Sequence, residues 1–419
     1  MSIDQTIGYV TPVRAFLHEG EIYMQAASGR VADALAKHYE KVYICTRVQC
    51  GSPLAPADKP LGAPNLELIP QPFWNSTAGS LPHVFGIVCA YIRTCRRANI
   101  LFVRGMCPYI SVLYLCAFLF RRPICHWIVG DPVSVLETST RKGRLLDTLA
   151  MLYAWQDRMF SRLGRWLTGG AFICNGRELA RMYASPRTLA TVSSTVNECE
   201  FFSRFDTCQS GPIRILFVGY LRPEKGIEHL LEAVGKLKKD MQWDLEIVGP
   251  DDGFPKYRRR LDEIVAALGI EDRVRWIGYV PYGEMLFDRM RAADIFVLPS
   301  LSEGTPHVLV EARANGLPCI STRVGGVPDT VTDGVDALLV PPKNPRALAL
   351  AIERIVRDQK LRRALIRNGL NLARKQTLEC FIETVRTQLD PSLEPIRAAI
   401  TRPQIQKECE SSNISGLTS

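Results

Sequence analysis

Short apolar stretches of strand length alternate with longer stretches of helical periodicity along most of the chain. In the first half this pattern predicts strands at 7–10, 42–46, 66–69, 100–104, 124–129 and 172–174, and helices at 31–38, 83–97, 108–120 and 143–161. In the second half it predicts strands at 213–218, 244–248, 274–277, 295–299, 319–322 and 337–340. Strands that alternate with helices favour parallel α/β construction.

Chain length and one polar segment indicate the domain organisation. A chain of 419 residues is too long for one ordinary core, which favours two domains. The segment 201–212 is polar and carries Gly211-Pro212, so we expect a linker there between a domain at 1–200 and another at 213–375. We expect a helical segment at 376–400 that packs back on the first domain, and a disordered, Ser-rich tail at 401–419.

The composition is that of an ordinary soluble globular protein, with 47% hydrophobic and 23% charged residues. The opening Met1 to Gln5 lacks the basic and apolar regions of a signal peptide. The 13 cysteines lie in apolar stretches without C-x-x-C spacing, so no zinc or redox motif is expected. Together these features predict reduced, mostly buried thiols in a cytoplasmic protein.

The positive charge gathers in the first half of the chain. The net charge is +9, and residues 93–187 hold 15 Arg or Lys against 5 Asp or Glu. Arginines bracket apolar runs, including 109–120, whose 12 residues are too few to span a bilayer. That run fits a core helix or a membrane-facing helix. We expect an anionic membrane surface as a partner, with the protein peripheral on the inner face, and no nucleic acid, because no binding motif accompanies the charge.

Two carboxylates mark the second half of the chain. Glu303 follows a buried strand and Glu311 lies eight residues later, about one turn into a helix that begins at Pro306 and ends near Gly316. A helix N-terminus at the carboxyl end of a buried strand is a ready anion site. A phosphate cradle flanked by two acceptors of hydroxyl hydrogen bonds suits a nucleotide-sugar.

This segment resembles the E-x7-E motif of retaining glycosyltransferases of group 1, and the resemblance extends from about 214 to 373. It implies the GT-B architecture, in which two Rossmann-like domains have parallel sheets that face each other across a cleft. It also implies that Glu303, with the backbone of Gly304 and Thr305, faces the donor sugar. Glu311 is implied to hold the ribose hydroxyls.

The same resemblance assigns the diphosphate to the turn after the strand at 213–218. Lys225 is implied to reach the diphosphate, and Gly219 to line the donor site; without the resemblance, Lys225 is a solvated turn lysine. The family often has a cation where this chain has Tyr220. Arg222 is the candidate to replace it.

Three further segments are implied to line the donor site. Gly249 matches the family's glycine loop beside the nucleotide, with a plain tight turn as the alternative. Tyr279 and Val280 match a stretch that lies against the base through its backbone, so the base is not specified. The paired Gly325-Gly326 allow close backbone approach to a ligand, and Asp329 stands where the family commonly has Glu.

The first half is expected to supply the acceptor side, with weaker signals. In the family the first strand leads into a glycine loop under the donor phosphates; that loop corresponds to 25–30, where Gly29 is the candidate donor-binding residue. Asp131, which follows the strand at 124–129, is a candidate catalytic carboxylate. Its alternative is a helix N-cap before Pro132.

The resulting expectation is a metal-independent, retaining hexosyltransferase with no cofactor, which moves a sugar from a nucleoside-diphosphate sugar to a lipid-linked or saccharide acceptor. Polysaccharide or glycolipid biosynthesis is the expected setting. No acidic triplet of the metal-binding kind follows a strand. A sugar-nucleotide epimerase, a phosphorylase and a non-catalytic nucleotide-sugar-binding protein remain open as alternatives. The sequence does not specify donor sugar, acceptor or oligomeric state.

Overall fold

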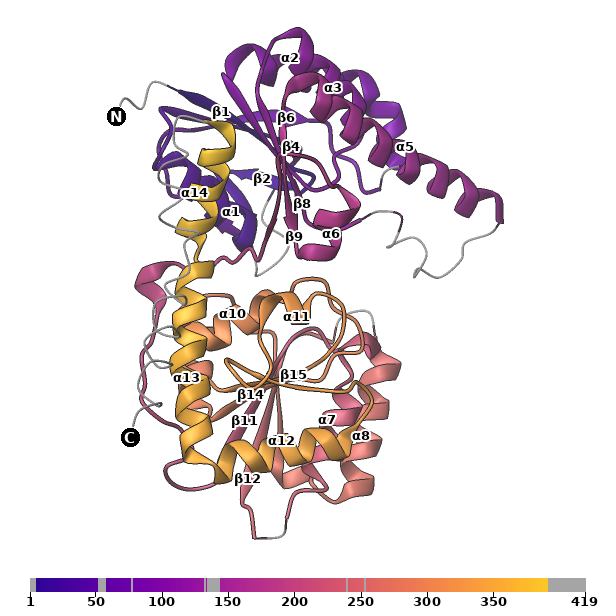
Figure 1. Ribbon diagram of the computed structural model, residues 1–419. Helices are drawn as coiled ribbons and strands as arrows, with labels where there is room; N and C mark the ends of the chain where they lie inside the picture. The colour runs from indigo at the N-terminus through magenta and orange to yellow at the C-terminus, as the bar shows by residue number, and fades with distance from the viewer. Residues whose placement is uncertain are drawn as a thin grey trace, which may run out of the picture.

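The computed structural model describes residues 5–51, 58–76, 78–131, 133, 144–238, 240–251 and 254–390. They form two α/β domains, the N-terminal one above the C-terminal one in Figure 1. The expected parallel α/β construction in two domains is confirmed.

The N-terminal sheet is built on seven parallel strands in the order β10-β9-β8-β7-β1-β4-β6. They are β1 (Thr6–Val10), β4 (Lys41–Cys50), β6 (Leu66–Gln71), β7 (Ile100–Arg104), β8 (Ile124–Ile128), β9 (Ala171–Asn175) and β10 (Thr188–Thr191). Three short strands extend the sheet beside β4: β2 (Ala15–His18), β3 (Glu21–Gln25) and β5 (Asp58–Pro60). All residues of β8 and β9 are buried, as a parallel sheet covered on both faces requires.

Helices cover both faces of this sheet. One face carries α1 (Ala26–Ala36) and the chain's last described helix, α14 (Leu378–Leu389), in one apolar cluster. The other carries α2 (Val84–Arg97) and α3 (Ile110–Leu119), with α5 (Arg144–Thr168) beside α3. A short helix, α6 (Arg177–Met182), follows β9. Figure 1 shows α14 alongside α1 in the upper domain, although α13 precedes it in the lower domain.

The C-terminal sheet is fully parallel, in the order β13-β12-β11-β14-β15-β16. The strands are β11 (Ile213–Val218), β12 (Trp243–Val248), β13 (Val274–Gly278), β14 (Ile295–Leu298), β15 (Cys319–Thr322) and β16 (Leu338–Val340). The helices are α7 (Ile227–Val234), α8 (Pro255–Leu268), α9 (Glu284–Ala292), α10 (His307–Ala314), α11 (Val327–Thr330), α12 (Pro345–Arg357) and α13 (Gln359–Ala373). Five 3₁₀ turns complete the described elements: Ala78–His83, Glu198–Glu200, Pro223–Lys225, Glu271–Arg273 and Arg374–Gln376.

Each sheet reverses its strand order at one point, between β1 and β7 in the first and between β11 and β14 in the second. In open α/β sheets, ligands bind beyond the carboxyl ends of the strands at such a switch point. The residues that follow these four strands are therefore the first candidates for function.

The strands predicted from the sequence are confirmed, with ends shifted by a residue or two, apart from β4, which is longer. The pattern missed β2, β3, β5 and β10, which are short or partly exposed and carry no sustained alternation. The first helix begins at Ala26 rather than at residue 31, and α5 continues to Thr168 rather than ending at 161.

The chain between the two sheets rests on the C-terminal domain. The N–H of Phe202 donates to the carbonyl of Ala314 at 2.9 Å, and Arg204 donates to the carbonyls of Ala293, Met290 and Asn315 at 2.8–3.0 Å. The boundaries predicted for the two domains stay predictions. The predicted tail at 401–419 lies outside the described residues.

Candidate active site

A cation and a carboxylate meet at the switch point of the C-terminal sheet. Lys225 ends the 3₁₀ turn after β11, and Glu303 lies in the loop after β14. The Nζ of Lys225 is 2.7 Å from Oε1 of Glu303, and the hydroxyl of Ser300 donates to the same oxygen at 2.6 Å. The Glu303 side chain is only 9% exposed. Two donors within the chain therefore orient the Glu303 carboxylate.

Backbone packing brings these two loops together. Gly226 follows Lys225 with φ +61°, and a Cβ at this position would lie 2.4 Å from the carbonyl oxygen of Pro299. The N–H of Leu301 donates to the carbonyl of Glu224 at 2.8 Å. Only glycine fits at 226, because any side chain would push the Lys225 turn away from Glu303.

Paired glycines hold the Glu303 loop from its other side. A Cβ on Gly325, whose φ is +46°, would lie 1.9 Å from the carbonyl oxygen of Glu303, and one on Gly326 would lie 2.2 Å from that of Gly304. The sequence predicted that this pair lets the backbone approach a ligand. The structure shows a close approach of this pair to the Glu303 loop, and its approach to a ligand stays a prediction.

Gly249 has a similar structural requirement. Its φ is +146°, and a Cβ there would lie 1.9 Å from the carbonyl oxygen of Gly219. The tight-turn alternative thus accounts for its identity, while contact of Gly249 or Gly219 with a nucleotide stays a prediction.

Glu311 is a buried carboxyl on the fifth residue of α10. Its residue is 7% exposed, and it forms no ion pair within the part of the chain that the structure describes. Burial raises the pKa of Glu311 to about 7; the nearby charge of Arg30 lowers it and that of Glu200 raises it. A buried carboxyl without a counter-ion destabilises a fold, and groups of this kind cluster at functional sites.

The N-terminal domain closes one side of the Glu311 environment through α1. Arg30 on this helix donates to both carboxylate oxygens of Glu200 at 2.7 Å and to the carbonyl of Thr195 at 3.0 Å. Its guanidinium lies 4.8 Å from the ring centroid of Tyr282, in the loop after β13. The sequence did not predict these residues; the arginine that directly follows Gly29 was the available signal.

The other predicted donor residues lie at the same edge of the C-terminal sheet. Tyr279, 39% exposed, and the half-buried Val280 follow β13. The guanidinium of Arg222 lies 4.8 Å from the ring centroid of Tyr220 and 5.6 Å from that of Phe254, with Glu224 at 3.9 Å. Arg222 is thus held between two aromatic rings at the end of β11, and its contact with phosphates stays a prediction.

A second contact joins the domains at Asp329. The N–H of Arg177, at the start of α6, donates to Oδ2 of Asp329 at 2.6 Å. A Cβ on the preceding Gly176 would lie 3.1 Å from that oxygen and 3.4 Å from Oγ1 of Thr305. The carboxyl edge of the first sheet therefore approaches the loop that carries Gly304 and Thr305.

The two candidates of the first domain lie in surroundings that the sequence did not anticipate. Asp131 is 3% exposed, forms an ion pair with Arg158 and accepts a hydrogen bond from the hydroxyl of Tyr183 at 3.3 Å. Its catalytic role stays a prediction, and Pro132 of the N-cap alternative lies outside the described residues. Gly29 lies inside α1, so the predicted glycine loop is wrong: β1 is followed by the β2–β3 hairpin, which delivers the chain directly into the helix.

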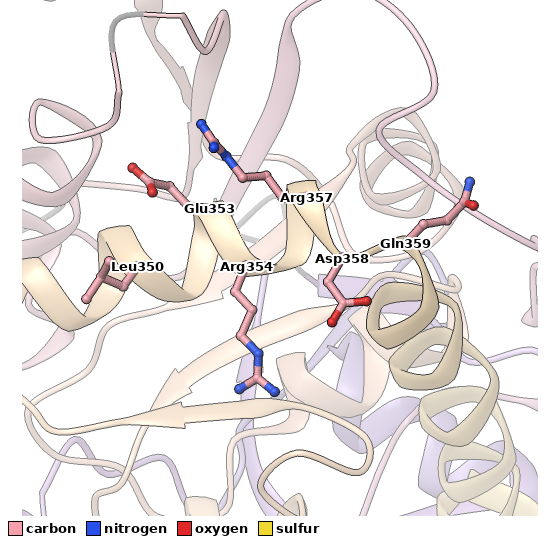
Figure 2. A pocket seen from close by; sticks show the side chains of 6 residues that line it. All are labelled: Leu350, Glu353, Arg354, Arg357, Asp358 and Gln359. Atoms are coloured by element: carbon pink, nitrogen blue, oxygen red, sulfur yellow. The ribbon is translucent and has the colours of Figure 1, made fainter.

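A surface depression where α12 meets α13 is separate from the site around Glu303 and Glu311. Leu350, Glu353, Arg354, Arg357, Asp358 and Gln359 line it. Figure 2 shows Glu353 and Arg357 on one side of the helix and Arg354 and Asp358 on the other, so the charged groups do not converge. Arg357 also pairs with Asp240 at 3.3 Å. We assign no function to it.

Comparison with known sequences gives a family match over the C-terminal domain and several partial relatives. Residues 201–372 match the family described as glycosyl transferases group 1. The D-inositol 3-phosphate glycosyltransferase of Corynebacterium glutamicum is 36% identical over 155 residues, covering 35% of this chain and 36% of that protein. The enzyme of the same name from Streptomyces bingchenggensis is 33% identical over 233 residues, covering 50% and 51%. The chain thus spans about half or less of these relatives.

Comparison with solved structures covers both domains. Anabaena HepE in complex with UDP aligns with a TM-score of 0.65 and 15% identity, over 91% of this chain and 99% of that one. Sucrose-phosphate synthase from Thermosynechococcus elongatus aligns with a TM-score of 0.64 and 19% identity, over 93% and 100%. At these identities the likeness shows the fold, and the predicted GT-B architecture is confirmed.

Proposed function

We propose that this chain, whose C-terminal domain belongs to the group 1 glycosyltransferases, is a retaining glycosyltransferase that moves a sugar from a nucleoside-diphosphate sugar to a hydroxyl acceptor. One observation carries the proposal: at a single switch point, Lys225 and Ser300 orient the Glu303 carboxylate, and the buried Glu311 lies on the helix that follows. Lys225 complements a diphosphate, Glu303 a sugar and Glu311 a ribose.

The chemistry is a displacement at the anomeric carbon on one face of the sugar. The bond from this carbon to the diphosphate oxygen breaks, the bond to the acceptor oxygen forms, and the acceptor proton passes to the departing phosphate. Lys225, Arg222 and the positive end of α10 stabilise the negative charge that develops on the leaving group. Glu303 and the backbone of Gly304 and Thr305 position the sugar, so the reaction proceeds without a metal ion.

The names of similar proteins support parts of this proposal. HepE binds UDP and UDP-glucose, which favours uracil as the base of the donor. WaaG, which aligns with a TM-score of 0.61 over 91% of this chain, is involved in lipopolysaccharide biosynthesis. A role in polysaccharide or glycolipid biosynthesis is the setting that we propose.

The test is release of nucleoside diphosphate from a panel of UDP-, GDP- and ADP-sugars, with and without saccharide and lipid-linked acceptors. We expect acceptor-dependent release that persists in excess EDTA, and NMR of the product should show the anomeric configuration of the donor. Abolition by EDTA with rescue by magnesium, or an inverted product, would contradict the mechanism.

The same assay separates the alternatives. Epimerised donor without acceptor would indicate an epimerase, and phosphate-dependent release of sugar 1-phosphate a phosphorylase. Binding of the donor with neither hydrolysis nor transfer would indicate a non-catalytic nucleotide-sugar-binding protein.

We also propose that the N-terminal domain docks on an anionic membrane from the cytoplasmic side. Its α5 carries exposed apolar side chains at 152, 155, 159, 163 and 166, spacings that align them on one stripe of the helix: Leu152, Trp155, Met159, Leu163 and Trp166. The neighbouring α3 adds exposed Leu115, Phe118 and Leu119. Figure 1 shows α5 extending from the upper domain away from the site.

Charge and length support attachment to the surface of the bilayer. The exposed Arg162 lies beside the stripe, and the exposed Arg121 follows α3. No helix in the described ranges is long and apolar enough to cross a bilayer. Tryptophans on an apolar face with arginines at its border suit an interfacial helix on anionic lipid. The apolar run at 109–120 has a buried side, which includes Leu113 and Ala117 and fits the core-helix role. Its exposed side, with Leu115, Phe118 and Leu119, is the part that we propose faces the membrane.

A further inference from the structure

Arg104 is a cation at the switch point of the N-terminal sheet, outside the cluster of Lys225, Ser300 and Glu303. Arg104 is the last residue of β7, which lies beside β1 where the strand order reverses. By the rule that locates the donor site at β11 and β14, the carboxyl ends of β1 and β7 form the corresponding crevice of the first domain. Arg104 is thus a charged residue at that crevice.

The surroundings of Arg104 are polar and aromatic, and they orient its guanidinium. Nη1 donates to the hydroxyl of Ser28 in the first turn of α1. The guanidinium carbon lies 5.0 Å from the ring centroid of Trp127 on β8. Its charge also acts on the buried hydroxyl of Tyr9, whose pKa burial raises and Arg104 lowers.

Among the described residues, no carboxylate neutralises this arginine. Within the described part of the chain Arg104 forms no ion pair, whereas Arg30, Arg158 and Lys225 each have one. The Arg104 side chain is half-buried, so its charge is only partly solvated. A half-buried guanidinium without a counter-ion, oriented by a hydroxyl and a ring, is arranged to bind an oxyanion.

The C-terminal domain faces Arg104 with His307, the first residue of α10. Burial lowers the pKa of His307 to about 4, with the charge of Arg104 adding to the effect and the backbone of Ser193 opposing it. Its Nδ1 atom is shielded from solvent and has no hydrogen-bond partner among the described residues. Arg104 therefore lies close to the start of α10, where the donor sugar would be held.

We propose that Arg104, with the hydroxyl of Ser28, binds an anionic group, a phosphate or a carboxylate, of the acceptor substrate. The proposal rests on the glycosyltransferase function set out above and gives the substrate class of its acceptor. The donor diphosphate has cations of its own in Lys225 and Arg222, on the opposite domain. Arg104, Ser28 and Trp127 all belong to the first domain, which is expected to supply the acceptor side, so we assign an anion that they hold to the second substrate.

The test uses the full-length chain saturated with whichever of UDP, GDP and ADP it binds, so that the donor phosphate site is filled. Inorganic phosphate and acetate, as probes of the two anion classes, are then titrated by calorimetry at millimolar concentrations and constant ionic strength. We expect the wild-type complex to bind one of them. Arg104→Gln should weaken this binding by about 10- to 100-fold, the range for loss of a hydrogen bond to a charged group.

Nucleotide affinity and control variants distinguish binding of an acceptor anion from binding of the donor diphosphate. Arg104→Gln should leave nucleoside-diphosphate affinity unchanged, and Arg104→Lys should retain part of the anion binding. Lys37→Gln removes an exposed cation at the C-terminal end of α1 in the same domain and should change neither affinity. Ser28→Ala provides a second variant that keeps the charge, with a several-fold loss expected, and thermal melting checks the fold of each.

Two results would overturn the proposal. If Arg104→Gln weakens nucleotide binding as much as anion binding, Arg104 belongs to the donor site. If the wild-type nucleotide complex binds neither anion, the acceptor-anion site does not exist. Failure of all three nucleotides to bind the wild-type chain is a separate result, which counts against the glycosyltransferase function itself.

Discussion

The two glutamates of the E-x7-E segment differ in their electrostatic surroundings. Glu303 is ion-paired with Lys225 at 2.7 Å and hydrogen-bonded to Ser300, whereas the buried Glu311 has no ion pair among the described residues. The first is held in place by its neighbours, and the second is stabilised when a ligand supplies hydroxyl donors. Their substitutions should therefore have different consequences.

Stability against pH tests the burial of Glu311. Its pKa rises from 4.5 to about 7, so the stabilisation by its protonated form is complete below pH 4.5 and lost as the pH rises through 7. At pH 8 the Glu311→Gln variant should therefore be more stable than wild type, with a free energy of unfolding larger by up to about 3 kcal/mol. Denaturant titration measures this difference. The difference should shrink towards pH 4.5.

A surface substitution provides the control for that measurement. Glu263→Gln removes a carboxylate from the exposed face of α8. An equal difference in unfolding free energy from wild type for the two variants at both pH values would contradict the conclusion that Glu311 is buried without a compensating charge.

Steady-state kinetics should separate the two glutamates in catalysis. Glu311→Gln should chiefly raise the donor KM, because ribose contacts are alike in the ground and transition states. Glu303→Gln should chiefly lower kcat, because charge develops at the sugar that this residue faces. A fall in kcat for Glu311→Gln with a rise in donor KM for Glu303→Gln would show that the roles assigned to the two residues are wrong.

At the scale of elements, glycine-dependent contacts between loops position the site. Gly325 permits the turn before α11 to lie on the backbone of Glu303, where a Cβ would be 1.9 Å from the carbonyl oxygen. Gly325→Ala should displace that loop, lowering both stability and nucleotide affinity; the strain alone is about 1–3 kcal/mol.

Gly334→Ala is the matched control for loop displacement. This glycine also has positive φ, +73°, but a Cβ there meets nothing within 4 Å. It should reduce stability through backbone strain and leave nucleotide affinity unchanged. Equal losses of affinity in both variants, measured by calorimetry, would refute the contact-based explanation.

The apolar stripe of α5 gives a second prediction at this scale. The exposed fractions of Trp155 and Trp166 are 59% and 69%. Replacing both by Ala should lower binding to anionic vesicles by about tenfold or more, since burying one large apolar side chain contributes about 1.5–3 kcal/mol. Leu350→Ala, a comparably exposed apolar residue on α12, is the control.

Co-sedimentation with vesicles measures this binding. We expect little binding to neutral vesicles and release at high salt, where the Debye length contracts to about 3 Å at 1 M. Equal pelleting with neutral and anionic vesicles, or none with either, would contradict membrane docking. The arginines of α2 contribute less than their number suggests, since Arg97 pairs with Glu67.

At the scale of the whole molecule, the sequence predicted what depends on local pattern. Buried parallel strands are continuous apolar runs, and the Glu303 to Glu311 segment joins a strand, a loop and a helix within a short stretch. Contacts between distant parts of the chain carry no such signal. Arg30 with Tyr282 and Arg177 with Asp329 join residues 252 and 152 positions apart, through side chains or backbone that no periodicity marks.

The placement of Gly29 in a loop, though not its predicted donor contact, failed for a similar reason. Gly29 was placed in a loop because the first strand was expected to lead directly into it. The β2–β3 hairpin intervenes, and its pairing with β4 depends on contacts remote in sequence. Residues at the carboxyl edge of the first sheet, such as Arg104, become candidates only once the strand order is known.

The central claim is that the switch point of the C-terminal sheet binds a nucleoside diphosphate through Lys225. Calorimetric titration of UDP, GDP and ADP into the wild-type chain and Lys225→Ala tests it most directly. We predict that at least one nucleotide binds the wild type and that the variant binds it more weakly by about 1.5–3 kcal/mol, with its fold intact. Unchanged affinity in the folded variant, or no binding to the wild type, would contradict the claim.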